Sequence, residues 1–184
     1  MLRHNPINMN SKRSISLLTL ALLDLMDKKD YKKISVSEIT NHAGLVRSTF
    51  YAHFTSKEDI ISNYLLEILQ TKFSDYSSKG LLSDSDFIRG YFSMWGEQVD
   101  LLKKLMDNDL LLILNQLDTH FEVICHSYFS SQDTCLSQVT MKYANAFYAD
   151  ALASVLKQWV KTGMKESVED LTDIFLELAT YEYK

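Results

Sequence analysis

The sequence predicts an all-α fold, with an N-terminal three-helix domain that contains a helix-turn-helix and a larger C-terminal helical domain. The 184 residues include one proline and five glycines, and Pro6 lies outside every periodic segment. Little therefore interrupts helices or favours tight hairpin turns. Apolar residues recur three and four apart in successive segments, as the buried face of a helix requires.

The first helix is expected at about residues 11–28. Residues 1–10 carry no periodicity and are expected to form a loose tail. An apolar stripe at helical spacing then follows, formed by Ile15, Leu18, Leu22 and Leu25. Lys28 and Lys29 suit the C-terminal end of this helix, where the helix dipole favours positive charge.

The next elements form the predicted helix-turn-helix. Residues 35–38 read Ser-Val-Ser-Glu, a capping box in which serine and glutamate each bond a free backbone N–H at a helix start. A second helix is therefore expected over 36–43, and Gly44 suits the left-handed residue that ends it. A third is expected over 46–53, with Phe50 packing inward. This arrangement is typical of proteins that place the second helix of the motif in the major groove of DNA.

The rest of the chain predicts helix after helix. Residues 56–59 form another capping pattern and open a longer helix. Three further helix starts are expected, at Ser83 or Asp84, at Asp107 or Asn108 before the apolar stretch 110–117, and at Ser167. A long helix with many alanines is expected over 137–162, ended by Gly163. We therefore divide the chain into a tail (1–10), a helix-turn-helix domain (11–60) and a helical body (61–184).

Charge is distributed unevenly between these parts. Residues 1–60 hold nine Lys and Arg against six Asp and Glu, whereas residues 61–184 hold ten against 18, so the net charges are +3 and −8. A basic N-terminal segment on an acidic body indicates that only one end meets a polyanion such as DNA.

Membrane insertion and secretion are not expected. Lys12 and Arg13 precede an apolar stretch, as in a signal peptide, but Asp24 and Asp27 follow it and no small-residue cleavage site is present. No run approaches the roughly 18 apolar residues that span a bilayer. We expect a soluble protein of the cytoplasm.

Catalysis and metal binding are not expected either. His120, Cys125 and His126 do not share a helix face well, so they make a poor metal site. The chain has no His-Glu-x-x-His motif, no phosphate-binding glycine loop and no glycine-flanked serine nucleophile. We expect no enzyme activity, no metal and no cofactor.

Residues 34–61 resemble the DNA-binding signature of the tetracycline-repressor (TetR) family. Four short matches fall in register: Ala43-Gly44, Thr49-Phe50-Tyr51, His53-Phe54 and Ser56-Lys57-Glu58. With the first helix, the resemblance covers residues 11–61. Trp159 and the segment 163–167 also resemble one ligand-domain subtype of that family.

The resemblance and the side-chain chemistry together give the candidate DNA contacts. The expected base-reading residues are Val46, Arg47 and Ser48, because arginine pairs with guanine edges, serine bonds to bases and valine contacts thymine methyls. The expected phosphate contacts carry hydroxyl, imidazole or cationic groups, and they are Lys12, Arg13, Ser37, Thr49, Tyr51, His53 and Lys57. The family often has Ser or Thr where this chain has Val46, so operator preference cannot be carried over from relatives.

The resemblance further implies a ligand pocket in the helical body and a dimer formed by the last two helices. The candidate pocket residues are aromatic or polar: Phe87, Tyr91, Trp95, Phe121, Phe147 and Asp150. The candidate dimer residues are small or lie on an apolar stripe: Ala146, Ala153, Leu171, Ile174, Phe175 and Leu178.

The function implied is a homodimeric repressor that a small-molecule effector releases from palindromic operator DNA. The alternative is a ligand-independent co-regulator that acts through protein contacts. An open apolar cavity would favour the first, and a filled core with an exposed apolar patch the second. A helical enzyme or lipid carrier is a third, weaker hypothesis.

Overall fold

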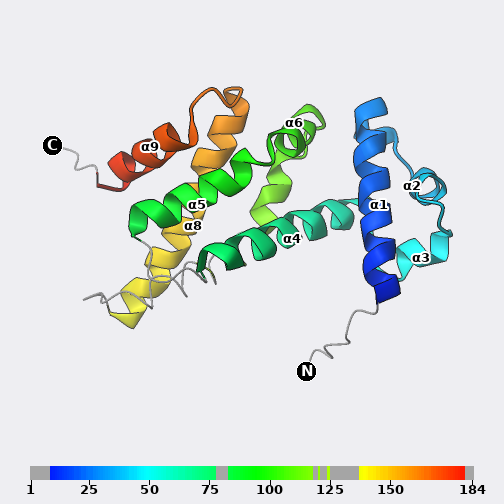
Figure 1. The fold of residues 1–184 in the computed structure, drawn as a ribbon, viewed down its shortest axis with the longest axis horizontal. Helices are drawn as coiled ribbons and strands as arrows, with labels where there is room; N and C mark the ends of the chain where they lie inside the picture. Colours follow the sequence, from blue (N-terminus) through cyan, green and yellow to red (C-terminus); the bar gives the residue numbers. More distant parts are fainter. Residues whose placement is uncertain (1–8, 78–82, 118–119, 121–123, 125–136, 181–184) are drawn as a thin grey trace. The chain divides into compact units, whose positions relative to one another are not determined.

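The computed structural model describes residues 9–77, 83–117, 120, 124 and 137–180, and these residues confirm the predicted all-α fold. They form helices and short 3₁₀ segments and contain no strand (Figure 1). The chain divides into two compact units between Tyr64 and Leu65. The sequence placed this boundary after residue 60. The difference arises because one helix, α4 (Lys57–Ser77), contributes residues to both units.

The first unit contains α1 (Met9–Lys28), the 3₁₀ segment η1 (Tyr31–Lys33), α2 (Val36–His42), α3 (Arg47–Tyr51) and the start of α4. α1 packs against α2, and α2 packs against α3 (Figure 1). The core consists of apolar side chains from all four helices, each no more than 1% exposed: Leu18, Leu22, Ile39, Phe50, Ile60 and Ile61.

The helix-turn-helix forms for the reasons its sequence gives. Ser35 caps α2, and the reciprocal bond from the Ser35 backbone N–H to Glu38 completes the capping box. Gly44 has a φ of +67°, the left-handed conformation that glycine adopts without steric cost. The Leu45 N–H then donates to the Thr40 carbonyl at 2.8 Å, so the turn closes on α2 before α3 begins.

The second unit contains the rest of α4, α5 (Asp84–Gly96), α6 (Val99–Asp107), the 3₁₀ segment η2 (Leu111–Leu117), α8 (Gln138–Lys161) and α9 (Val168–Thr180). Capping bonds from Ser83, Ser137 and Ser167 begin α5, α8 and α9. None of the helices in the described ranges is long and apolar enough to cross a membrane.

α5 and α9 form the closest helix pair of this unit (Figure 1). Phe92 and Phe175 meet edge to face, with ring centroids 6.4 Å apart. Near the other end of the pair, a Cβ added to Gly96 would lie 3.3 Å from the Cγ2 atom of Val168. A hydrogen at position 96 therefore lets the two helices approach closely.

The connection between α8 and α9 is a tight turn. Gly163 and Met164 both have positive φ, at +90° and +54°. The Trp159 indole N–H donates to the Glu166 carbonyl at 3.1 Å, which ties the end of α8 to the chain that enters α9.

The region around residue 110 differs from its prediction. Asn108 ends α6 instead of starting a helix, Asp109 takes a φ of +59°, and residues 111–117 form a 3₁₀ segment. α6 begins at Gln98 without a side-chain cap, so the sequence carries no start signal for this helix.

Candidate nucleic-acid interface

α3 presents a polar face around a buried anchor. The Phe50 side chain is 0% exposed, whereas Val46 and Tyr51 are 66% and 54% exposed. Arg47 and Ser48 are also exposed. The three predicted base-reading residues therefore lie side by side at the start of α3, where a helix in the major groove contacts base edges.

Arg47 and Tyr51 form a pair on this face. They are one helical turn apart, and Arg47 Nη2 donates to the Tyr51 hydroxyl at 3.3 Å. The guanidinium carbon also lies 5.9 Å from the centroid of the Tyr51 ring, within the range of a cation–π contact. The pair holds a cationic, five-donor group on the exposed surface, where it can bond to guanine or phosphate.

The N-cap of α3 is unusual. Val46 occupies this position in an extended conformation and makes no side-chain cap bond. A serine or threonine here would accept an N–H bond from the first turn, which a valine cannot do. Its exposed side chain instead adds an apolar group to a polar surface.

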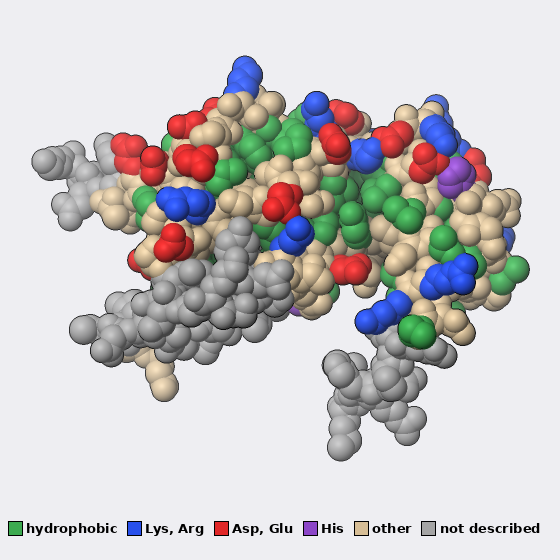
Figure 2. Space-filling view, in the orientation of Figure 1, with side chains coloured by type: hydrophobic (Ala, Val, Ile, Leu, Met, Phe, Trp, Pro, Cys, Tyr) green, Lys and Arg blue, Asp and Glu red, His purple; other side chains and the backbone are tan. Residues whose placement is uncertain are grey.

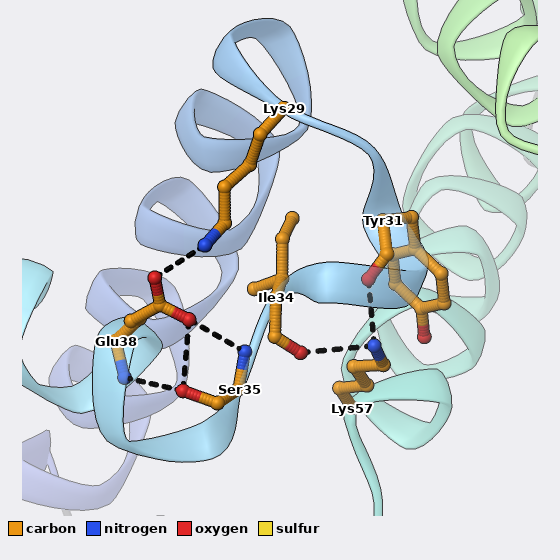
Figure 3. A network of polar contacts seen from close by, with 6 residues as sticks. All are labelled: Lys29, Tyr31, Ile34, Ser35, Glu38 and Lys57. Atoms are coloured by element: carbon orange, nitrogen blue, oxygen red, sulfur yellow. Dashed lines mark hydrogen bonds and ion pairs between the residues drawn. The ribbon is translucent and has the colours of Figure 1, made fainter.

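Lys57 at the start of α4 makes contacts that its sequence position did not predict (Figure 3). Its ammonium donates to the carbonyl oxygens of Tyr31 at 2.6 Å and Ile34 at 2.9 Å. It also lies 4.1 Å from the centroid of the Tyr31 ring. Two of the three N–H donors of this ammonium thus hold η1 against the start of α4. Burial, and next the Glu58 carboxylate, raise the pKa of the Tyr31 phenol above its usual range.

A second polar cluster holds the start of α2 (Figure 3). Lys29 forms an ion pair with Glu38, and Glu38 Oε2 accepts from the Ser35 N–H at 2.9 Å and the Ser35 hydroxyl at 2.8 Å. The Lys29 ammonium, followed by the two Ser35 donors, lowers the pKa of the Glu38 carboxyl to about 2. The end of α2 is held as well, since His42 Nε2 lies 2.5 Å from Asp24 Oδ2 of α1.

The remaining predicted phosphate contacts are spread over three segments. Lys12 and Arg13 are exposed on α1. Ser37 lies in the first turn of α2, and Thr49 and His53 lie on or just after α3, and all three are partly buried. Sequence reasoning missed the roles of Lys29 and Tyr31, because contacts across 9 or 26 positions leave no local pattern.

The predicted pocket residues separate into two groups. Phe87, Tyr91 and Trp95 are 5%, 4% and 1% exposed in the core of the second unit. Phe147 is 65% exposed, and Asp150 is exposed as well, because α8 buries the face with Ala149, Leu152 and Leu156 and turns these two outward. Phe121 lies outside the described residues. Phe147 and Asp150 therefore do not line the interior of the protomer.

Two cavities in the second unit are lined by described residues. One, of about 20 Å³, lies among Tyr91, Trp95, Leu114 and Ala153. The other, of about 110 Å³, opens between α5, α8 and α9. The first has room for about one water molecule.

The predicted dimer residues also divide. Leu171 and Phe175 are 3% exposed and belong to the core of the protomer. Ile174 and Leu178 are 39% and 62% exposed. Ala146 is partly buried, and Ala153 lines the 20 Å³ cavity. Only part of the apolar stripe of α9 is therefore accessible to a partner.

Comparisons with known families cover most of the chain. Residues 18–63 match the bacterial regulatory proteins of the tetR family. Residues 83–181 match a family described as a transcriptional regulator C-terminal region. The first match contains all of α2 and α3, and the second contains α5, α6, α8 and α9.

Individual proteins agree with these matches. The chain is 28% identical over 123 residues to the HTH-type dhaKLM operon transcriptional activator DhaS of Lactococcus lactis, an alignment that covers 63% of this chain and 59% of DhaS. The structure of Lin0861 from Listeria innocua has a TM-score of 0.74 and 15% identity, covering 96% of this chain and 95% of that one. A TetR regulator from Streptococcus agalactiae gives 0.64 and 19%, covering 92% and 94%. At these identities the structures share the fold.

Proposed function

Because this chain belongs to the tetR family of bacterial regulatory proteins, we propose that it regulates transcription as a homodimer that reads a palindromic operator through α3. The observation that carries this proposal is the exposed face of Val46, Arg47, Ser48 and Tyr51, held on the buried ring of Phe50. One short helix contacts only a few base pairs, so two copies on a two-fold axis supply the specificity.

The residues of the first unit take two roles in this proposal. Val46, Arg47 and Ser48 read bases, with Arg47 on a guanine edge and Val46 on a thymine methyl. Exposed Lys12 and Arg13, together with Ser37, Thr49, Tyr51 and His53, hold phosphates and fix the register of α3. Lys57 adds positive charge near the backbone of the DNA while its N–H groups hold η1.

The homodimer is proposed to form through the outward faces of α8 and α9. Tyr143 and Phe147 lie one turn apart on α8 and are 69% and 65% exposed, and Ile174 and Leu178 are the exposed apolar residues of α9. Such a surface on a soluble domain is typical of an interaction site. The proposed interface therefore uses Ile174 and Leu178 and leaves Leu171 and Phe175 in the core.

We propose that an effector acts on the second unit and shifts the dimer toward a state in which the two α3 helices no longer fit their half-sites. α4 contributes residues to both units, so it is the element through which the two states differ. Such a protein acts in the cytoplasm as a repressor. The name of DhaS describes an activator, so an effector that strengthens operator binding is the alternative sign.

A second candidate function is a co-regulator without a small-molecule effector. The exposed apolar side chains of α8, with Val139 69% exposed beside Tyr143 and Phe147, favour it. These side chains would then bind a second protein, and the core of the body would remain filled.

Selection of operator DNA from a random pool tests the main proposal. The purified protein should enrich a palindrome whose half-sites lie about one helical turn, roughly 34–36 Å, apart. The Arg47→Ala variant serves as the control and should lose enrichment. Enrichment of no sequence, or of the same sequence by the Arg47→Ala variant, would contradict the proposal.

A further inference from the structure

The 110 Å³ pocket between α5, α8 and α9 has an apolar, aromatic interior. Phe87 and Phe175 line it and are 5% and 3% exposed, and Leu152 is 1% exposed. Tyr148 completes the aromatic wall, with its ring centroid 6.5 Å from that of Phe175. An engineered apolar cavity of about 150 Å³ holds benzene, so this pocket has room for an alkyl group of about four or five carbons.

The mouth of the pocket is polar and negative. Asp84 and Thr180 line it and are both exposed, so a carboxylate and a hydroxyl meet solvent where the apolar walls end. Thr180 also ends α9, where the helix dipole places partial negative charge, and the last turn of α9 holds no basic side chain. The described residues that line the pocket include no Lys, Arg or His.

The charge of the surroundings acts in the same direction. Residues 61–184 carry a net charge of −8. Figure 2 shows acidic side chains gathered over the part of the view where Figure 1 places α9 and the neighbouring end of α5. The first turn of α5 favours anions by its dipole, but Asp84 and Asp86 already supply two carboxylates there. This potential attracts cations and repels anions.

We propose that this pocket is the effector site and that the effector is a small organic cation: an alkylamine or alkylammonium whose apolar part lies against Phe87, Tyr148 and Phe175 and whose charge lies beside Asp84. Aromatic faces and a carboxylate are the two groups that recognise such cations. The term effector rests on the function proposed above, whereas binding of the cation does not.

Isothermal titration calorimetry with three probes of the same carbon skeleton tests the site. The probes are isopentylamine, isopentyl alcohol and isovalerate at pH 7, which carry a positive, neutral and negative head group. We expect the amine to bind about tenfold more tightly than the alcohol, as one partly screened ion pair with a cation–π contact gives, and isovalerate to give no heat. Equal affinities for amine and alcohol, or no binding of the amine, would overturn the inference.

Two variants locate the binding. Asp84→Asn should bring the affinity for the amine down to that for the alcohol and leave the alcohol unchanged. Ala179→Trp, at an exposed position that lines the pocket, should abolish binding of both probes. Asp173→Asn, on an exposed residue of α9 outside the lining, is the matched control and should bind like the wild type. Full amine affinity in Asp84→Asn or Ala179→Trp would overturn the assignment to this pocket.

The link to regulation is measured separately. Saturating isopentylamine should change the affinity for the selected operator at least about fivefold, the lower end of typical coupling between two sites. Binding of the amine without any change in operator affinity would overturn the effector role. The calorimetry contains no DNA, so a failure there leaves the DNA-binding proposal intact, and a failed operator selection leaves the calorimetric result intact.

Discussion

The Lys57 ammonium lies 4.1 Å from the centroid of the Tyr31 ring and donates to the Tyr31 carbonyl at 2.6 Å. This contact joins the start of α4 to η1, the segment between α1 and α2. A lysine that the sequence assigned to DNA therefore also stabilises the domain that binds DNA. The two roles can be separated by experiment.

Replacement of Lys57 by methionine should reduce the free energy of unfolding. Methionine keeps most of the apolar stem but removes two hydrogen bonds from a charged donor, which contribute about 1.5–3 kcal/mol. Urea denaturation followed by circular dichroism measures the loss. Lys33→Met, at an exposed lysine of η1, is the matched control and should stay within about 0.5 kcal/mol of the wild type. Equal losses in both variants would show that the contacts of Lys57 contribute nothing specific.

The phosphate role of the basic residues should appear in the salt dependence of operator binding. Lys12→Ala removes an exposed cation of α1 and should reduce the slope of log K against log salt by about one unit. Lys57→Met should do the same if its charge also faces phosphate. Fluorescence anisotropy at several salt concentrations, on specific and non-specific DNA, gives the slopes. An unchanged slope for Lys12→Ala would remove α1 from the interface.

Arg47 should determine base preference. Arg47→Ala should weaken binding to the selected operator by about 1–3 kcal/mol and relax preference at one position in each half-site. Tyr51→Phe removes only the hydroxyl that accepts from Arg47 Nη2 at 3.3 Å, so it should lower that preference less and leave the salt slope unchanged. Competition between operators with single base changes reports both effects. If Arg47→Ala binds every operator as the wild type does, α3 is not the recognition helix.

Charged substitutions on the outward faces of α8 and α9 should produce monomers. Phe147→Glu and Leu178→Glu place a carboxylate on residues that are 65% and 62% exposed, so the protomer should still fold. Leu112→Glu, at a leucine of η2 that is 74% exposed, is the matched control and should remain dimeric. Sedimentation equilibrium at micromolar concentration distinguishes these outcomes. A dimer in both α8 and α9 variants would place the interface elsewhere.

The capping box of α2 should make stability depend on acid pH. The pKa of Glu38 is lowered from 4.5 to about 2, so its carboxylate stabilises the fold fully above about pH 4.5, and that contribution is lost as the pH falls through about 2. Glu38→Gln should therefore melt below the wild type at pH 7, and the difference should shrink toward pH 2. Ser35→Ala removes the partner hydroxyl and should share this pH dependence. A melting difference that is constant from pH 7 to pH 2 would contradict it.

The sequence predicted those parts of the fold that local chemistry determines. The capping residues Ser35, Ser83 and Ser167 and the left-handed Gly44 and Gly163 all take the predicted roles, because each acts within a few positions of itself. α6 has no side-chain cap and was missed for the same reason. The face of Arg47 and Ser48 followed from the spacing around Phe50.

Features that depend on packing between distant segments were not predicted. The amphipathic stripe of α9 indicated a partner surface, but it could not tell that Leu171 and Phe175 pack within the protomer while Leu178 stays exposed. The same limit applies to Phe147, whose outward direction depends on which face of α8 meets the core. The partners of Lys57 lie 23 and 26 positions away, beyond any local pattern.

The close approach of α5 and α9 at Gly96 has an evolutionary consequence. A methyl group at position 96 would press on Val168 at 3.3 Å, tighter than ordinary contact, so any lineage that acquires a side chain there has to make room on α9. Sizes at positions 96 and 168 should therefore covary among relatives, with alanine at 96 accompanied by alanine or glycine at 168. A collection of aligned descendants would record the spacing of these two helices without any structure being solved.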